Sequence, residues 1–207
     1  MHLNERKKNT VADIIALIER LAPPCLAESW DNSGLQIGNR KWPINKVWVA
    51  LDPLLPVISA AADQQIDMLI THHPLIFKPL RSIDLGTCQG QAIEKALKAK
   101  IAIYAAHTNL DSACDGVNDV FAQRIGLSNL TVMVPVRSKN EGSEQTTTVS
   151  NTGMGRIGSL AHPVTLAQLA QHIKKQFGVK ILRVSGHMDQ RIQKVAVCSG
   201  SGRQLKF

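Results

Sequence analysis

Residues 67–77 read Asp-Met-Leu-Ile-Thr-His-His-Pro-Leu-Ile-Phe, an apolar run that is interrupted by two histidines and a proline. A short apolar run that follows a helix-like stretch is typical of a buried strand in a parallel sheet. Pro74 has no N–H to donate to a neighbouring strand, so we expect the strand to end at His72 and His73. Open α/β sheets bind their ligands at such strand ends. The stretch therefore predicts a buried strand with a ligand site at its end.

The two histidines are adjacent, which restricts how they can act together. Side chains of neighbouring residues on a regular strand point to opposite faces of the sheet. His72 and His73 can therefore serve one site only where the extended backbone breaks, or where the site holds two metal ions. Pro74 marks such a break.

A second apolar run, residues 100–106, leads into His-Thr-Asn-Leu-Asp at 107–111. As a neighbouring parallel strand, it would bring His107 and Asp111 to the sheet edge that carries the histidine pair. Imidazole nitrogens and carboxylate oxygens are ligands of zinc, iron and manganese. For either stretch alone, a histidine that belongs to hydrogen-bonded structure is the more common case. The two stretches together favour a metal site.

Length and composition are those of an ordinary globular protein. A chain of 207 residues can bury a sizeable core, as one large domain or two small ones. No apolar run approaches the length of a membrane span. The basic residues near the N-terminus lead into an amphipathic segment with Asp13 and Glu19, which is no signal-peptide core. We therefore expect a cytoplasmic protein.

Charge and cysteine content add little about function. The net charge of +8 would help attract nucleic acid, a nucleotide or another anion, but the basic residues are spread along the chain. The four cysteines form no C-x-x-C pair, so neither a disulfide framework nor a zinc knuckle is predicted. No recognisable motif assembles a Ser-His-Asp or Cys-His arrangement for nucleophilic catalysis.

Helix-like and strand-like segments alternate in the first half of the chain. Apolar residues recur at helical spacing in residues 11–21 and 90–100, and another helix separates the β-rich run 46–52 from the histidine stretch. Three strands alternating with helices predict a mostly parallel sheet with helices on both faces. Between the first helix and the first of these strands we expect a polar turn at Asp31, with Trp30 in the core.

The second half of the chain predicts a smaller α/β unit. Residues 137–153 are polar, and we expect a long exposed loop or hairpin tip there, near a domain boundary. An amphipathic helix, 165–177, would pack on an antiparallel sheet. The strands expected in this sheet cover residues 154–160, 179–184 and 193–198.

Four motifs, taken in their order and spacing, resemble those of the NIF-three-like family. They are Trp-Asp-Asn-Ser-Gly-Leu-Gln-Ile-Gly at 30–38, Thr-His-His-Pro-Leu-Ile-Phe at 71–77, the stretch at 107–111 and Cys-Ser-Gly-Ser-Gly at 198–202. Bacterial members of this family include YbgI, and they are often labelled GTP cyclohydrolase 1 type 2 homologue. The resemblance implies a two-domain α/β fold, a ring-shaped homohexamer, and two divalent ions of zinc, iron or manganese per subunit.

The resemblance also implies roles for single residues. His72 and His73 match the paired histidine ligands of the family, and Asp111 matches its carboxylate ligand. His107 matches a histidine that we place beside the metals, as a proton-transfer group or a support for the ligands. The family completes its site with a Gly-His-x-x-x-Glu segment beyond the Gly-Ser-Gly turn, which this sequence does not contain. We therefore expect an incomplete dinuclear centre and weaker metal binding than in a full-length relative.

The expected organisation follows from the same resemblance. We expect a metal-site α/β domain in residues 1–126 and a second α/β domain in residues 127–194. Residues 195–207 would begin a segment that returns to the first domain and would complete its sheet.

Two functional hypotheses remain open at this point. The first is a metal-dependent hydrolase in which a metal-bound water attacks an electrophilic carbon or phosphorus, with ring opening of GTP as the version that the family label implies. The alternative is a non-catalytic scaffold that binds metal or associates with nucleic acid as a ring. The partners we expect are a small-molecule or nucleotide substrate and further copies of the chain, with no membrane.

Overall fold

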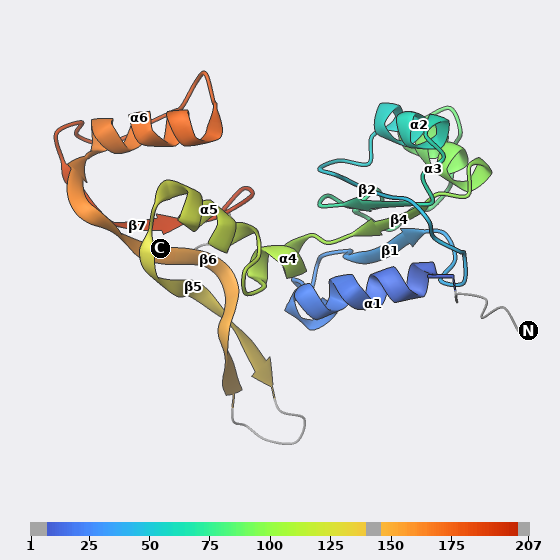
Figure 1. Cartoon of the computed structure of the whole chain (residues 1–207), viewed down its shortest axis with the longest axis horizontal. Helices are drawn as coiled ribbons and strands as arrows, with labels where there is room; N and C mark the ends of the chain where they lie inside the picture. The colour runs from blue at the N-terminus through green and yellow to red at the C-terminus, as the bar shows by residue number, and fades with distance from the viewer. Residues whose placement is uncertain (1–7, 140–145, 203–207) are drawn as a thin grey trace, which may run out of the picture. The chain divides into compact units, whose positions relative to one another are not determined.

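The structure is a computed structural model that describes residues 8–139 and 146–202. It consists of two compact units, Met1–Leu110 and Asp111–Phe207, which are drawn in Figure 1. Within the described ranges, no helix combines the length and the apolar character needed to cross a membrane.

The first unit is built on a four-stranded sheet with the strand order β1-β4-β3-β2. Its strands are β1 (Gly34–Ile37), β2 (Val47–Ala50), β3 (Met68–Thr71) and β4 (Ala102–Ala105). β2, β3 and β4 are parallel, as the alternation of strands and helices predicts. β1 pairs antiparallel with β4 and forms one edge of the sheet.

Helices cover both faces of this sheet (Figure 1). They are α1 (Val11–Leu21), α2 (Leu55–Asp63) and α3 (Cys88–Lys98), with a short 3₁₀ turn η1 (Pro24–Leu26) after α1. Ile15 of α1 packs with Met68 and Tyr104, whereas Ile58 of α2 packs with Leu69 on the other face. Adjacent residues of β3 thus point to opposite cores, which explains why the strand reads as a continuous apolar run.

Helix ends coincide with the capping signals in the sequence. The hydroxyl of Thr10 accepts a hydrogen bond from the backbone N–H of Asp13, and the Asp13 carboxylate accepts one from the backbone N–H of Thr10. At α3 the hydroxyl of Thr87 accepts a hydrogen bond from the N–H of Gly90, without the reciprocal bond seen at α1. These caps satisfy N–H groups that the first turn leaves without helical partners, and so they fix where each helix begins.

The second unit contains an antiparallel sheet of strand order β5-β6-β7 and two main helices. Its elements are β5 (Ser128–Lys139), β6 (Thr146–Thr165) and β7 (Arg191–Val197), with α5 (Val117–Ile125) and α6 (Leu166–Phe177); a short α4 (Thr108–Ser112) joins the two units. The polar segment 137–153 was expected to be a long loop or a hairpin tip, and its described residues, 137–139 and 146–153, are paired strand of β5 and β6. Residues 140–145 of this segment lie outside the described residues.

The strand expected at residues 179–184 is wrong. Residues 179–190 connect α6 to β7 without regular structure. The apolar side chains that suggested a strand are exposed, with 84% of the Ile181 surface accessible. A strand needs a neighbouring strand and a core for its apolar face, and within the described residues this segment belongs to no sheet and leaves most of its apolar side chains exposed.

The division between the units lies at Leu110, whereas the sequence led us to expect the first domain to extend through residue 126. The difference arises from α5, whose Ala122 and Ile125 pack with Leu169 and Val197 in the core of the second unit. Residues 195–197, expected in a return segment, belong to β7, which pairs with β6. The helix and the strand therefore belong to the antiparallel unit because their apolar faces are buried there.

Candidate metal centre

The three parallel strands of the first unit end level with one another. Ala50 of β2 is in register with Thr71 of β3, which is in register with Ala105 of β4. Beyond this row the chain carries Asp52 after β2, His72 and His73 after β3, and His107 after β4. One edge of the sheet thus collects three imidazoles and a carboxylate, at the place where parallel sheets bind ligands.

The backbone breaks at the histidine pair, as the sequence predicts. β3 ends at Thr71, and the hydroxyl of Thr71 donates a hydrogen bond of 2.8 Å to the carbonyl oxygen of His73. The ring centroids of His72 and His73 are 5.0 Å apart. A regular strand would hold these rings on opposite faces of the sheet, so this local turn is what places both in one site.

His107 joins the pair to form a cluster of three candidate ligands. One nitrogen from each of the three rings lies within 4.8 Å of the other two. Two imidazole nitrogens bound to the same zinc ion would be about 3.3 Å apart, given bonds of about 2.0 Å and tetrahedral angles. Small side-chain rotations would close that difference, so the donor set suits a divalent ion that accepts imidazole.

Each of the three rings is oriented by a hydrogen-bond acceptor at its Nδ1 atom. His72 faces the carbonyl oxygen of Ala106 at 3.0 Å, His73 faces Asp52 at 2.6 Å, and His107 faces Asp31 at 2.7 Å. A carbonyl or carboxylate oxygen only accepts, so Nδ1 carries the proton and Nε2 bears the lone pair of the neutral ring. Metal-binding histidines are held in the same way in known metal sites.

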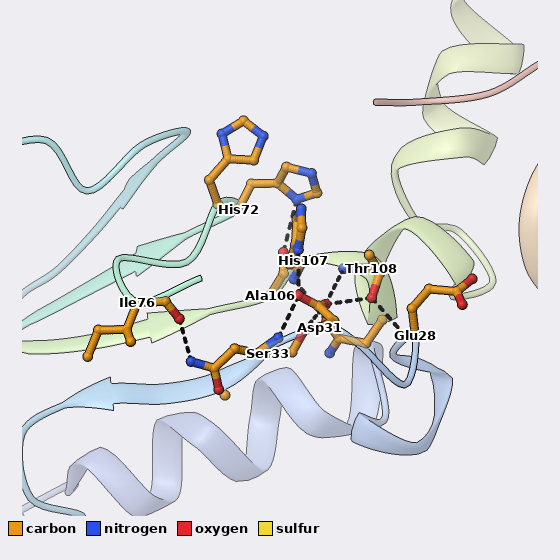
Figure 2. A network of polar contacts seen from close by, with 12 residues as sticks. Glu28, Asp31, Ser33, His72, Ile76, Ala106, His107 and Thr108 are labelled. Atoms are coloured by element: carbon orange, nitrogen blue, oxygen red, sulfur yellow. Dashed lines mark hydrogen bonds and ion pairs between the residues drawn. The ribbon is translucent and has the colours of Figure 1, made fainter. Parts of the chain in front are cut away.

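Asp31 is the most strongly hydrogen-bonded of these acceptors, as Figure 2 shows. Its buried carboxylate accepts hydrogen bonds from the His107 ring, from the hydroxyl of Ser33 at 2.6 Å, and from both the N–H and the hydroxyl of Thr108. Burial alone would raise the pKa of Asp31, but the bonds from His107, Ser33 and Thr108 outweigh it and hold the pKa well below its usual range. Asp31 therefore stays ionised behind His107.

Asp31 and Asp52 were not identified from the sequence as supports of the histidines. Asp31 was expected only to form a turn. Its neighbour Trp30 was expected to lie in the core, yet 47% of the Trp30 surface is exposed. Asp31 does bond the N–H of Asn32, as a turn residue would. Asp52 carried a usable signal, because it follows a buried parallel strand directly, as the two histidine motifs do.

Asp111, the expected carboxylate ligand, belongs to the second unit. Its side chain accepts a hydrogen bond of 2.6 Å from the hydroxyl of Ser199 in the Gly-Ser-Gly turn. Asn118 connects the same elements, because its amide donates to the Asp111 carbonyl oxygen and accepts from the Ser199 N–H. The turn after β7 is thus held to the start of the second unit, and a metal-binding role of Asp111 stays a prediction.

Comparison with known proteins identifies the family. The family model described as Duf34/NIF3 (NGG1p interacting factor 3) matches residues 9–206. The chain belongs to the Duf34/NIF3 family. A curated relative from Clostridium acetobutylicum, named GTP cyclohydrolase 1 type 2 homolog, is 35% identical over 195 residues, which are 94% of this chain and 69% of the relative. A Bacillus subtilis relative of the same name is 42% identical over 160 residues, covering 72% of this chain and 43% of its own length.

Solved structures of the family share the fold. A Bacillus cereus protein related to NIF3 has a TM-score of 0.86 and 29% identity, covering 96% of this chain and 79% of that protein. Reduced HcgD from Methanocaldococcus jannaschii has a TM-score of 0.74 and 33% identity, covering 93% of this chain and 70% of that protein. The Duf34/NIF3 fold expected from the sequence motifs is therefore confirmed.

Proposed function

We propose that this chain is a metal-dependent hydrolase whose metal ligands include His72, His73 and His107. The observation that carries the proposal is the orientation of the three rings, each hydrogen-bonded through Nδ1 to an acceptor. Structural histidines need no such common arrangement, whereas a metal site needs several Nε2 atoms turned toward one point. The names of the curated relatives support the choice of reaction, because they refer to GTP cyclohydrolase, an activity in which water attacks a ring carbon and a carbon–nitrogen bond of the ring breaks.

The residues of the site would have distinct tasks. A divalent ion held by the three imidazoles would act as a Lewis acid and would increase the acidity of a water molecule at neutral pH. Asp31, which stays ionised, fixes the His107 ring and raises its basicity toward the ion. The Asp52 carboxylate does the same for His73 at a more exposed position. Asp111 would supply the oxygen ligand that the family motif implies.

This assignment changes the role we expected for His107. The sequence comparison placed it as a proton-transfer or supporting group, but its ring centroid lies 5.2 Å from that of His72 and 5.7 Å from that of His73, which are 5.0 Å from each other. We therefore propose His107 as a third ligand. Proton transfer during hydrolysis then falls to another group, for which the exposed Asp52 carboxylate beside His73 is a candidate.

Metal content of the purified chain tests the proposal. Protein prepared without chelator is measured by elemental analysis, alongside the variants His73→Ala and His107→Ala. His162→Ala, which removes an exposed histidine of the second unit, is the matched control. We expect the wild type and the control to retain metal, and both site variants to lose it. Equal metal content in all four proteins would refute the ligand assignment.

Activity is tested with the same proteins once metal content is known. GTP and simpler hydrolase substrates are incubated with the metal-loaded wild type, and we expect turnover that a chelator abolishes and added metal restores. A homohexamer and two ions per subunit also belong to the proposal through the family resemblance, and sedimentation velocity together with the metal stoichiometry checks them. Turnover that is unaffected by complete metal removal would contradict a metal-dependent mechanism.

A further inference from the structure

Two separate segments of the first unit carry the histidine cluster and its main support. Asp31, which orients His107, lies before β1, whereas His72 and His73 lie after β3. β1 and β3 are not neighbours in the sheet, because β4 lies between them. Backbone pairing between strands therefore does not join these two segments directly, and their relative position depends on side chains.

Two side-chain amides hold the segments together through Ile76. The Asn32 amide donates to the carbonyl oxygen of Ile76 (Figure 2), and the Gln36 amide oxygen accepts from the Ile76 N–H at 3.1 Å. The Gln36 amide nitrogen also donates to the Asn32 carbonyl oxygen at 2.7 Å. Ile76 follows His73 closely in the sequence, and Asn32 is next to Asp31. These three residues, Asn32, Gln36 and Ile76, form an amide clamp between the two segments.

Gln36 takes part in the clamp at a point where β1 is irregular. Leu35 and Ile37 are in register with consecutive residues of β4, so Gln36 between them is an extra residue of the strand. An extra residue of this kind is a β-bulge, which re-aims a side chain away from the regular alternation of the strand. Bulges are common beside active sites. The irregularity therefore supports a task for the Gln36 side chain at the neighbouring histidine segment.

The histidine segment has another anchor that does not involve Asp31. Gln89 of α3 donates to the carbonyl oxygen of Leu75 at 2.7 Å, and the Leu75 side chain packs against the core that α3 covers. Loss of the amide clamp would therefore leave the segment folded but no longer fixed to the Asp31 segment. Because a metal site requires its ligands within a fraction of an ångström of their places, we expect such a shift to lower metal affinity.

We propose that Gln36 is a positioning residue of the metal centre, which keeps Asp31 and His107 in place relative to the histidine pair. The inference rests on the proposed function, because it assigns Gln36 a task for the proposed ligands. Residues that support metal ligands from outside contribute about 10-fold to 100-fold to metal affinity. Gln36 acts on the segments and does not bond a ligand, so we expect the lower end of this range, about tenfold.

The test compares Zn²⁺ affinity, measured by competition with a chelator, in the full chain and its variants. Gln36→Met keeps the length of the side chain but removes its hydrogen bonds, and Asn32→Leu breaks the clamp from its other side. Gln168→Met is the matched control, because the Gln168 amide oxygen accepts from the backbone N–H of Thr165 and helps to cap α6 in the second unit. The visible spectrum of bound Co²⁺ reports the geometry of the ligands, and the urea midpoint of the metal-free protein reports its stability.

We expect Gln36→Met and Asn32→Leu to weaken Zn²⁺ binding by about tenfold and to change the Co²⁺ spectrum, whereas Gln168→Met should change neither. A lower urea midpoint with unchanged Zn²⁺ affinity would mean that the clamp is only structural and would overturn the proposal. An equal loss of affinity in Gln168→Met would overturn it as well, because stability alone would then explain the effect.

The same measurements separate this proposal from the proposed function. Wild-type protein that binds no Zn²⁺ would refute the proposed ligands and the role of Gln36 together. Zn²⁺ binding by the wild type that Gln36→Met leaves unchanged would refute the role of Gln36 alone. A chain that binds Zn²⁺ but hydrolyses no substrate would count against the hydrolase, and a tenfold weaker affinity of Gln36→Met would still support the positioning role.

Discussion

Two polar clusters among the described residues, one from each unit, are completed in different ways. In the second unit the guanidinium of Arg156 donates to both oxygens of Asp119 at 2.6 Å and to the carbonyl oxygens of Gly153, Gly155 and Ala113. All five of its N–H donors are used, and only 2% of the residue is exposed. In the first unit, the Nδ1 atom of each of three histidines lies against an acceptor, and one nitrogen from each ring lies within 4.8 Å of the other two.

The difference separates a structural cluster from a candidate functional one. Arg156 and Asp119 satisfy each other inside the protein, so nothing about the pair requires a ligand. Asp31 bonds only the Nδ1 atom of His107, whose ring lies 5.2 Å and 5.7 Å from the rings of His72 and His73. Burial and charge are common to both clusters. The gathering of three imidazoles is what distinguishes the cluster in the first unit.

The largest expected effect comes from breaking the cluster in the second unit. Arg156→Met removes the cation and leaves the Asp119 carboxylate buried without its partner, together with three carbonyl oxygens. Loss of one member of a buried pair costs about 3–5 kcal/mol. We expect the free energy of unfolding to fall by that amount in urea denaturation, while metal content stays at the wild-type level.

The double variant Arg156→Met with Asp119→Asn is the control for this prediction. It removes the uncompensated charge and should recover part of the lost stability. If Arg156→Met unfolded at the wild-type urea midpoint, the cluster would not be structural, and the distinction drawn between the two units would fail.

The next effect concerns the cluster in the first unit. Asp31→Asn keeps the shape of the side chain but removes the charge that faces His107. Loss of such a supporting carboxylate lowers metal affinity by about 10-fold to 100-fold. Competition with a chelator measures it, and an unchanged affinity would show that Asp31 serves only to form the turn.

Acid unfolding of the same variant tests the pKa of Asp31. Because the folded protein holds this pKa below its ordinary value, the ionised form contributes stability at neutral pH, and the contribution is lost as the pH falls below about 4. Asp31→Asn has no such carboxylate. We expect the wild type to lose more stability than the variant between pH 4 and the onset of acid unfolding, as measured by circular dichroism.

A smaller effect is expected from Asp52→Asn. The pair of Asp52 with His73 is exposed, with 41% and 46% of the two side chains accessible, so solvent screens its charge. We expect metal affinity to fall by no more than about threefold. Asp63→Asn, an exposed carboxylate at the end of α2, is the control. If Asp52→Asn lowered metal affinity more than Asp31→Asn does, the exposed carboxylate would support the metal site more than the buried one, which is the opposite of what burial predicts.

How much of this site can be predicted from sequence depends on the distance between partners along the chain. The histidine pair and His107 follow apolar strands directly, so local patterns predict both the strands and the sheet edge where they meet. Asp31 lies 76 residues from His107, and no local pattern connects a turn residue to its acceptor role. The order of the strands in the sheet, which places residues far apart in the sequence side by side, decides that contact.

The domain division and the exposure of Trp30 were missed for a related physical reason. The apolar spacing of α5 predicts a helix with a buried face, but it does not indicate which core receives that face. Trp30 is large and apolar, which favours burial in general. The hydrogen bonds of the Asn32 and Gln36 side-chain amides, which hold its loop to the Phe77 loop, exist only in the folded structure. Local patterns predict most of the helices and strands, though not the irregular segment 179–184, and they predict the neighbours of each element only in part.

The smallest effect concerns Tyr104, a buried polar group that matches neither cluster. It lies in β4 beneath the helix α1, and its hydroxyl has no hydrogen-bond partner among the residues that the structure describes. Burial, with a contribution from the charge of Glu19, raises the pKa of Tyr104 to about 12. Tyr104→Phe removes a hydroxyl that the fold does not use, so we expect stability at neutral pH to stay the same or rise by up to about 1 kcal/mol.

The pH dependence of this variant decides between an unused hydroxyl and a hidden contact. A raised pKa means that the wild type has its full stability below the ordinary tyrosine value of about 10 and loses stability as the pH rises toward 12, because unfolding then allows the phenol to ionise. Tyr104 is the sole tyrosine of the sequence, so the ultraviolet absorbance of tyrosinate reports it alone. We expect late ionisation in the wild type and a smaller alkaline loss of stability in Tyr104→Phe. A destabilised variant would mean that the hydroxyl makes a hydrogen bond in the folded protein. The lack of a partner among the described residues would then not distinguish unused polar groups from functional ones.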